Sequence, residues 1–271
     1  MTNTKKINPV ELAICVILTL VIFVTGFIGI SHKRKIWLFA ENRIPVGLPT
    51  ETALRGAANT IEHGLTFASA PEGVREKIQS CPEALEWAAE YVYHWDKEYD
   101  HSIAADAEQH QFPLLLQWDK RWGYHIYGNN YMGINGCGPT ALSIVYTGLT
   151  GKTDVSPYDV AVYSSERDMY VPGVGTKWIM MLYGGMDYGL KVEELVTDFE
   201  KAKEALQAGE VLVCKVGPGD FTSGGHFIVL TEMDEDGQVT VRDPNSVINS
   251  LQKWDFDRIM EQTDFVWSYT T

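Results

Sequence analysis

The stretch that most constrains this chain is residues 133–143, GINGCGPTALS. Cys137 stands between two glycines, and Pro139 suits the first turn of a helix, where its missing N–H would have no partner anyway. Apolar residues then recur at helical spacing, at Leu142, Val145, Tyr146 and Leu149. The pattern predicts a helix whose N-terminus lies at or just after Cys137, where free N–H groups and the helix dipole stabilise a thiolate. We therefore interpret Cys137 as a nucleophile; the alternative is a buried structural cysteine.

Three apolar segments near the C-terminus are predicted to be strands. They cover residues 211–216, 227–231 and 239–241, and the polar residues 234–237 form a turn between the last two. The spacing of the apolar residues thus changes from a helical to a strand-like period in this part of the chain. The last two strands are expected to form a hairpin.

The register of this hairpin decides whether the cysteine has a base. A turn centred between residues 235 and 236 places His226 opposite Asn245 and makes Asp243 its diagonal neighbour on the same face. A slip of one residue would separate the two side chains. In the expected register Asp243 orients His226, which takes the proton of Cys137. The alternatives are a histidine that merely ends a strand and an aspartate that caps the Asp243-Pro244 turn.

Gln117 lies 20 residues before Cys137, in the segment where the globular domain is expected to begin. A side-chain amide N–H aimed beside a nucleophile can stabilise the oxyanion of a tetrahedral intermediate. We therefore predict Gln117 as the oxyanion donor. The alternative is a surface glutamine next to Trp118.

Residues 12–30 form an uncharged run of 19 residues, about the length of a transmembrane helix. The following SHKRKIW is a poor cleavage site for a signal peptide, so an uncleaved anchor is predicted. Basic residues lie on both sides of the run in nearly equal number, so the positive-inside rule gives almost no preferred orientation. Taken alone, the basic cluster at 33–35 favours a cytoplasmic C-terminal part. The acidic domain favours the opposite orientation. We expect a single-pass protein of the cell membrane with its catalytic domain outside the cell.

Between the anchor and the domain, residues 41–73 are polar and broken by proline and glycine, as in a linker or stalk. Ser80 and Glu83 have the spacing of a capping box. Aromatic residues follow at helical spacing, at Trp87, Tyr91 and Trp95. The sequence therefore predicts a tail and anchor over 1–32, a linker with a docked helix at about 80–99 over 33–110, and a catalytic domain over 111–271.

Composition excludes several partners and cofactors. The net charge of −14 argues against nucleic acid as the main partner. Beyond Cys15, in the apolar run, three cysteines remain without a CxxC pair, so neither a disulfide framework nor a zinc knuckle is predicted. His94, His101 and His110 are scattered among carboxylates at a spacing that suits no metal site. No metal and no organic cofactor is expected.

Four segments together resemble a known family. They are Gln117-Trp118-Asp119, Asn135-Gly136-Cys137-Gly138-Pro139-Thr140, Gly225-His226-Phe227-Ile228-Val229-Leu230 and Asp243-Pro244-Asn245-Ser246. Over about residues 111–271 the chain resembles the papain-like cysteine peptidases of the branch related to bacteriocin-leader (double-glycine) processing enzymes, in their stand-alone bacterial form. The resemblance implies an α+β fold in which the nucleophile helix packs on an antiparallel sheet. It also implies that Gln117 is the oxyanion donor, Cys137 the nucleophile, His226 the general base and acid, and Asp243 the orienting acid.

The chain departs from the bacteriocin-processing members in one respect. Those members are joined to transporter spans and an ATPase, whereas this sequence shows one apolar span and no ATPase motif. Double-glycine leaders therefore cannot be assumed as substrates. The expected function is that of a membrane-anchored cysteine peptidase acting on a peptide or protein substrate. The alternatives are a cell-wall peptide amidase or transpeptidase with the same dyad, and a non-catalytic peptide-binding module.

Overall fold

The computed structural model describes residues 68–271, all of which belong to the second of two compact units, residues 59–271. At its centre is a six-stranded sheet in the order β5-β10-β6-β7-β8-β9, in which every neighbouring pair is antiparallel. The strands are β5 (Lys191–Val196), β6 (Val211–Val216), β7 (His226–Met233), β8 (Gln238–Arg242), β9 (Lys253–Asp255) and β10 (Thr263–Thr270). Two small hairpins stand apart from this sheet: β1 (Ile126–Tyr127) with β2 (Asn130–Tyr131), and β3 (Tyr170–Val171) with β4 (Gly175–Thr176).

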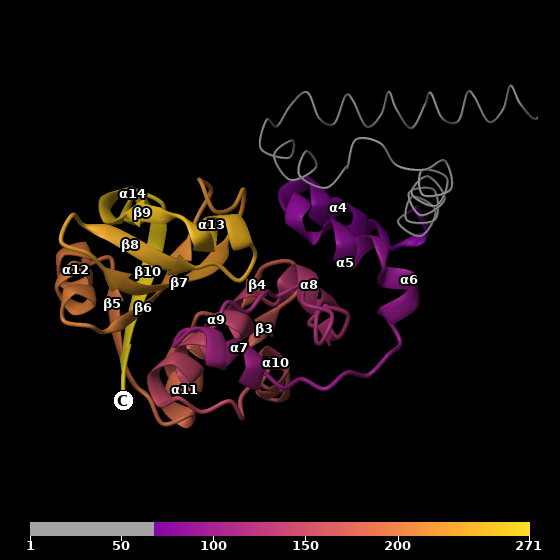
Figure 1. The fold of residues 1–271 in the computed structure, drawn as a ribbon, viewed down its shortest axis with the longest axis horizontal. Helices are drawn as coiled ribbons and strands as arrows, with labels where there is room; N and C mark the ends of the chain where they lie inside the picture. Colours follow the sequence, from indigo (N-terminus) through magenta and orange to yellow (C-terminus); the bar gives the residue numbers. More distant parts are fainter. Residues whose placement is uncertain (1–67) are drawn as a thin grey trace, which may run out of the picture. The chain divides into compact units, whose positions relative to one another are not determined.

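Helices cover both faces of the sheet (Figure 1). One face carries α9 (Cys137–Thr150), α10 (Pro157–Glu166) and α11 (Ile179–Asp187), and the other carries α12 (Phe199–Gln207) and α14 (Phe256–Met260). Alternation along β7 explains the two layers, since Phe227 and Val229 pack with α9 whereas Ile228 and Leu230 pack in the other core. Three short helices complete this part: α7 (Ala104–Gln109), α8 (Met132–Asn135) and α13 (Val247–Leu251). The α+β class expected from the resemblance is confirmed.

The predicted strands and their register agree with the structure. Residues 211–216 form β6, and the other two predicted segments lie within β7 and β8. Val229 pairs with Arg242 and Leu230 with Val241, which is the register that sets His226 opposite Asn245. A bulge after Leu230 shifts the pairing by one residue on the side of the turn, away from His226.

The segment before the domain is broken into short helices, not the one helix predicted for about 80–99. It consists of α4 (Glu72–Ser80), the 3-10 helix η1 (Pro82–Ala84), α5 (Leu85–Ala89) and α6 (Tyr91–His94). The predicted capping box is wrong: the Ser80 hydroxyl donates to the carbonyl of Lys77, and the Glu83 carboxylate accepts from residues after Asp243. Since α4 begins at Glu72, the end of the predicted linker is helical.

This segment packs against the domain, as the aromatic stripe predicts. The ring of Trp87 stacks on that of Tyr124, with centroids 5.5 Å apart, and the Tyr124 hydroxyl donates to the Trp87 carbonyl at 2.7 Å. A Cβ added at Gly133 would lie 2.4 Å from the Trp87 ring, so α8 and the indole are in close contact. The helices α4 and α5 therefore cover the segment that leads into the Cys137 helix.

Among the helices of residues 68–271, none combines the length and the apolar character needed to cross a membrane. The predicted span at 12–30, and the linker as far as residue 67, lie outside the described residues.

Candidate active site

Cys137 is the first residue of α9, as the glycine-flanked motif predicts. It is partly exposed, whereas the other cysteines of the described chain, Cys81 and Cys214, are buried. Packing explains the flanking glycines. A Cβ at Gly136 would lie 2.6 Å from the Met132 carbonyl oxygen, and one at Gly138 would lie 2.7 Å from Oγ1 of Thr176. The glycines let the start of α9 fit closely between α8 and β4 and leave the thiol accessible.

His226 and Asp243 meet at the end of the β7–β8 hairpin. The distance between His226 Nε2 and Asp243 Oδ1 is 2.7 Å, and the two side chains are 5% and 0% exposed. Since a carboxylate only accepts hydrogen bonds, Nε2 carries the hydrogen of this bond. Nδ1 is therefore the ring nitrogen left for the bond between His226 and the Cys137 thiol. The structure thus brings Cys137, His226 and Asp243 together.

The Asp243 carboxylate is held by more than the histidine. Oδ1 also accepts from the backbone N–H of Asn245, and Oδ2 accepts from the Asn249 side-chain amide, both at 2.8 Å. Asn249 was not predicted from the sequence. The sequence does contain a signal for it, because Asn249 lies three residues after Ser246, the usual spacing of an N-cap. In the structure the Asn249 N–H donates to the Ser246 hydroxyl. These bonds fix the rotamer of Asp243.

The electrostatics of the pair favour a thiolate and an imidazolium. Burial alone raises the pKa of Cys137, but the hydrogen bond and charge of His226, with smaller contributions from the Phe227 N–H and Lys77, lower it overall. Burial likewise lowers the pKa of His226, yet the charge and hydrogen bond of Asp243, together with Cys137, raise it to about 9. Each partner thus stabilises the charged form of the other. The thiol is set to lose its proton and the imidazole to hold it.

Gln117 forms hydrogen bonds with the segment before Cys137 and with the segment after Asp243. Its side-chain Nε2 donates to the carbonyls of Gly133 and Ile134, at 3.0 and 2.9 Å, just before the cysteine helix. Its backbone N–H donates to the carbonyl of Pro244, at 2.7 Å, just after Asp243. Both amide hydrogens are therefore in use. To donate to an oxyanion, Gln117 must release one of these carbonyls.

Lys77 is a further residue near the site that was not predicted from the sequence. It lies on α4 and is 8% exposed. Burial lowers its pKa, and the negative forms of Cys81, Cys137 and Asp243 act in the opposite direction. The signal in the sequence is the spacing: Lys77 lies three residues after Val74, so both residues fall on the buried face of the amphipathic helix α4. The Lys77 side chain is therefore near enough to Cys137 and Asp243 to interact with their charges.

The same segment also holds the loop that follows Asp243. The Glu83 carboxylate accepts from the Ser246 hydroxyl and from the backbone N–H groups of Val247, at 2.8 Å, and Ile248, at 3.2 Å. The carbonyl of Asn245 accepts from the Cys81 thiol at 3.0 Å. Residues 77–83 are thus part of the surroundings of the site.

Comparisons with known proteins concern the part of the chain that contains Cys137, His226 and Asp243. The model of the Peptidase_C39 like family matches residues 109–271. Among curated proteins nothing matches. A similar solved structure is the peptidase domain of Streptococcus ComA, a bi-functional ABC transporter involved in a quorum sensing pathway. It is 14% identical, and the match covers 50% of this chain and 91% of that domain with a TM-score of 0.36. At this score the likeness adds nothing to the assignment. Because the family model covers more than half of the chain, this protein belongs to the Peptidase_C39 like family.

Proposed function

We propose that this protein is a cysteine peptidase in which Cys137 is the nucleophile, His226 the general base and acid, and Asp243 the residue that orients the histidine. Family membership implies a cysteine peptidase, which is a hydrolase. The observation that carries the residue roles is the buried hydrogen bond between His226 and Asp243, with Cys137 as the next partner of the ring. No other cysteine of the described chain is partly exposed and paired with a histidine.

In the first half of the reaction, the Cys137 thiolate attacks the carbonyl carbon of a peptide bond. The carbonyl electron pair moves onto oxygen and gives a tetrahedral oxyanion. When this intermediate collapses, the C–N bond breaks, and the imidazolium of His226 donates its Nδ1 proton to the leaving amine. The products are a thioester on Cys137 and a free amine.

In the second half, His226 takes a proton from water, which attacks the thioester carbonyl. The C–S bond breaks, a carboxylic acid leaves, and the thiolate returns. Asp243 keeps the ring in the tautomer that both steps need. In this proposal the amide of Gln117 donates to the oxyanion after releasing the carbonyl of Gly133 or Ile134.

The test is cleavage of a peptide library by the full chain in water enriched in heavy oxygen, followed by mass spectrometry. We expect cleaved peptides whose new carboxyl groups carry the heavy oxygen, lost completely in Cys137→Ala. Cys214→Ala removes a thiol from the core on the other face of the sheet, so this variant should retain the activity. Amide-transfer products that contain no water oxygen would favour the transpeptidase instead. Binding without turnover would contradict the peptidase and favour the binding module.

We also propose that residues 12–30 anchor the protein in the cell membrane and that the catalytic domain faces outward. The support is the uncharged run of 19 residues, which matches the hydrocarbon core, and the acidic composition of the chain. Cells that express the full chain are fractionated, and intact cells are treated with protease. We expect the protein in the membrane fraction and its domain degraded from outside. Release into the soluble fraction, or protection in intact cells, would contradict one half of the proposal.

A further inference from the structure

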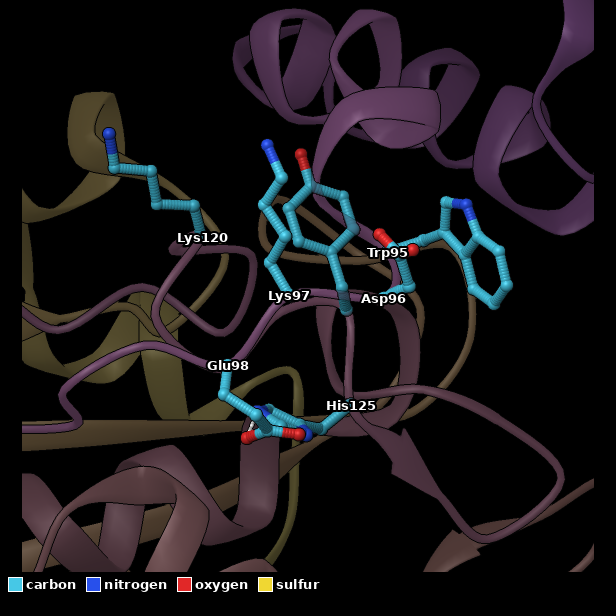
Figure 2. Close-up of a pocket in the computed structure, with 7 residues that line it drawn as sticks. Trp95, Asp96, Lys97, Glu98, Lys120 and His125 are labelled. Atoms are coloured by element: carbon cyan, nitrogen blue, oxygen red, sulfur yellow. Dashed lines mark ion pairs between the residues drawn. The ribbon is translucent and has the colours of Figure 1, made fainter.

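Two histidines and a glutamate that are scattered in the sequence, Glu98, His101 and His125, lie together in the structure. His101 lies before α7, and its Nε2 is 3.2 Å from Nε2 of His125, which lies before β1. Glu98 Oε2 is 3.8 Å from the same nitrogen of His125. One ligand atom from each of the three residues lies within 4.8 Å of the others. Figure 2 shows the Glu98 carboxylate beside the His125 ring.

The spacing of the two ring nitrogens suits a shared metal ion. Zinc–nitrogen bonds of about 2.0–2.1 Å at a tetrahedral angle hold two imidazole nitrogens roughly 3.3 Å apart. The observed separation is 3.2 Å, the distance of a hydrogen bond between the two rings, and a bound metal ion would replace the hydrogen that they share. An ion can therefore lie between the rings with little movement of either. Glu98, whose side chain is 84% exposed, is free to rotate and supply the oxygen ligand.

The two rings are held in place by their surroundings. Tyr158, on α10, packs against both, with ring centroids 4.1 Å from His101 and 4.5 Å from His125. His125 is fixed on both sides of its peptide unit: its N–H donates to the carbonyl of Trp122 at 3.0 Å, and its own carbonyl accepts from Met132 at 2.8 Å.

An arginine fixes the chain next to His101. Arg121 donates to the carbonyl of Ser102 at 2.7 Å and pairs with Asp106 at 2.7 Å. The backbone on which His101 stands is thereby tied to the start of the domain. The geometry of the two nitrogens therefore does not depend on a metal ion to form it.

The kinds of side chain at the site also suit a cation, since it contains two imidazoles and a carboxylate. Lys97 and Lys120 line the same pocket, but Figure 2 shows both amines pointing away from the Glu98 and His125 pair. Two imidazoles and one carboxylate are a ligand set that suits first-row transition metals.

We propose that Glu98, His101 and His125 form a binding site for a divalent transition-metal ion of the zinc class. Its three protein ligands leave the fourth position to water. The site joins two parts of the chain: Glu98 and His101 precede the family region that starts at residue 109, and His125 lies within it. The metal acts as a clamp that holds the end of the N-terminal segment on the domain. It takes no part in the chemistry of Cys137.

The first test is titration of the full chain with Co²⁺, which reports nitrogen ligation through visible absorption bands, followed by displacement with Zn²⁺. We expect His101→Ala to lose one bound ion per chain, and Glu98→Gln, whose exposed side chain bears little on folding, to weaken binding by at least about tenfold. His110→Ala is the matched control, since this exposed histidine lies outside the cluster. Equal stoichiometry and affinity in wild type, His101→Ala and Glu98→Gln would overturn the site.

The second test addresses the clamp. Limited proteolysis of the full chain by an added protease, with cuts mapped by mass spectrometry, measures how accessible residues 95–101 are to cleavage. Zn²⁺ should slow cleavage there in the wild type and in His110→Ala, and should have no effect in His101→Ala. Cleavage that is insensitive to Zn²⁺ in a wild type shown to bind the ion would overturn the clamp. Since neither readout measures cleavage of a peptide by this protein itself, the result is independent of the proposed peptidase function.

Discussion

His226 donates from Nε2 to Oδ1 of Asp243 across 2.7 Å, and both side chains are buried. The bond selects Nδ1 as the nitrogen that serves Cys137, and the Asp243 charge keeps the ring protonated to a higher pH than an ordinary histidine. One carboxylate therefore sets both the tautomer and the charge of the His226 ring.

Asp243→Asn should narrow the pH range in which the thiolate and the imidazolium coexist. The pKa of Cys137 is lowered and that of His226 is raised, so the ion pair forms above the first and is lost above the second. Without the Asp243 charge the pKa of His226 falls, and the thiol loses part of its stabilisation. We expect the alkaline limb of peptide cleavage to move to lower pH and kcat/KM to fall by roughly 10²-fold or more. An unchanged alkaline limb would contradict the role of Asp243.

Lys77→Met should raise the pKa of the Cys137 thiol, because the lysine charge is one of the contributions that lower it. Alkylation of Cys137 at neutral pH should therefore slow. Stability should not fall, since methionine of similar length avoids the cost of burying a charge. The exposed Lys152→Met is the control and should leave the rate unchanged. If the two variants alkylate Cys137 at the same rate, Lys77 does not act on the thiol.

Glu83→Gln should destabilise the protein by about 1–2 kcal/mol, since the carboxylate accepts from two N–H groups at the start of α13 and from a hydroxyl. Chemical denaturation measures the change. Glu86→Gln, an exposed glutamate three residues later, should change stability by much less. Equal stabilities of the two variants would show that residues 82–84 do not hold the loop after Asp243.

Gly133→Ala tests whether α5 is packed on the start of the cysteine helix. The new Cβ would lie 2.4 Å from the Trp87 ring, so the indole must move, at a cost of about 1–3 kcal/mol. Hydrogen exchange should then increase over α4 and α5. Gly224→Ala is the matched control, because a Cβ there meets nothing within 4 Å. Unchanged exchange in Gly133→Ala would mean that the segment is not docked through Trp87.

The residues proposed to carry the chemistry could be predicted because their signals are local. Cys137 follows from the glycine-flanked start of one helix, and the meeting of His226 with Asp243 follows from the register of one hairpin. On the side of the turn the pairing differs by one residue from the predicted register, and the bulge after Leu230 restores the predicted register at His226. Local pattern was sufficient where one element positions the side chain.

What the sequence did not predict depends on contacts between distant segments. β10 lies between β5 and β6 in the sheet although it is last in the chain, and nothing in its own residues reports that place. Glu83 was predicted to cap its own helix but binds residues 246–248 instead. The His101 and His125 pair is separated by 24 residues, so neighbouring spacings could not reveal it. Only the packed structure brings these groups together.

The most direct test of the central claim is the rate of iodoacetamide alkylation at Cys137 as a function of pH, followed by mass spectrometry in wild type and His226→Ala. Cys81 and Cys214 serve as internal references, because burial raises the pKa of both thiols. We predict fast labelling of Cys137 at and below neutral pH that His226→Ala abolishes. Labelling no faster than that of an ordinary thiol, and unchanged in the variant, would contradict the coupled thiolate on which the proposed function depends.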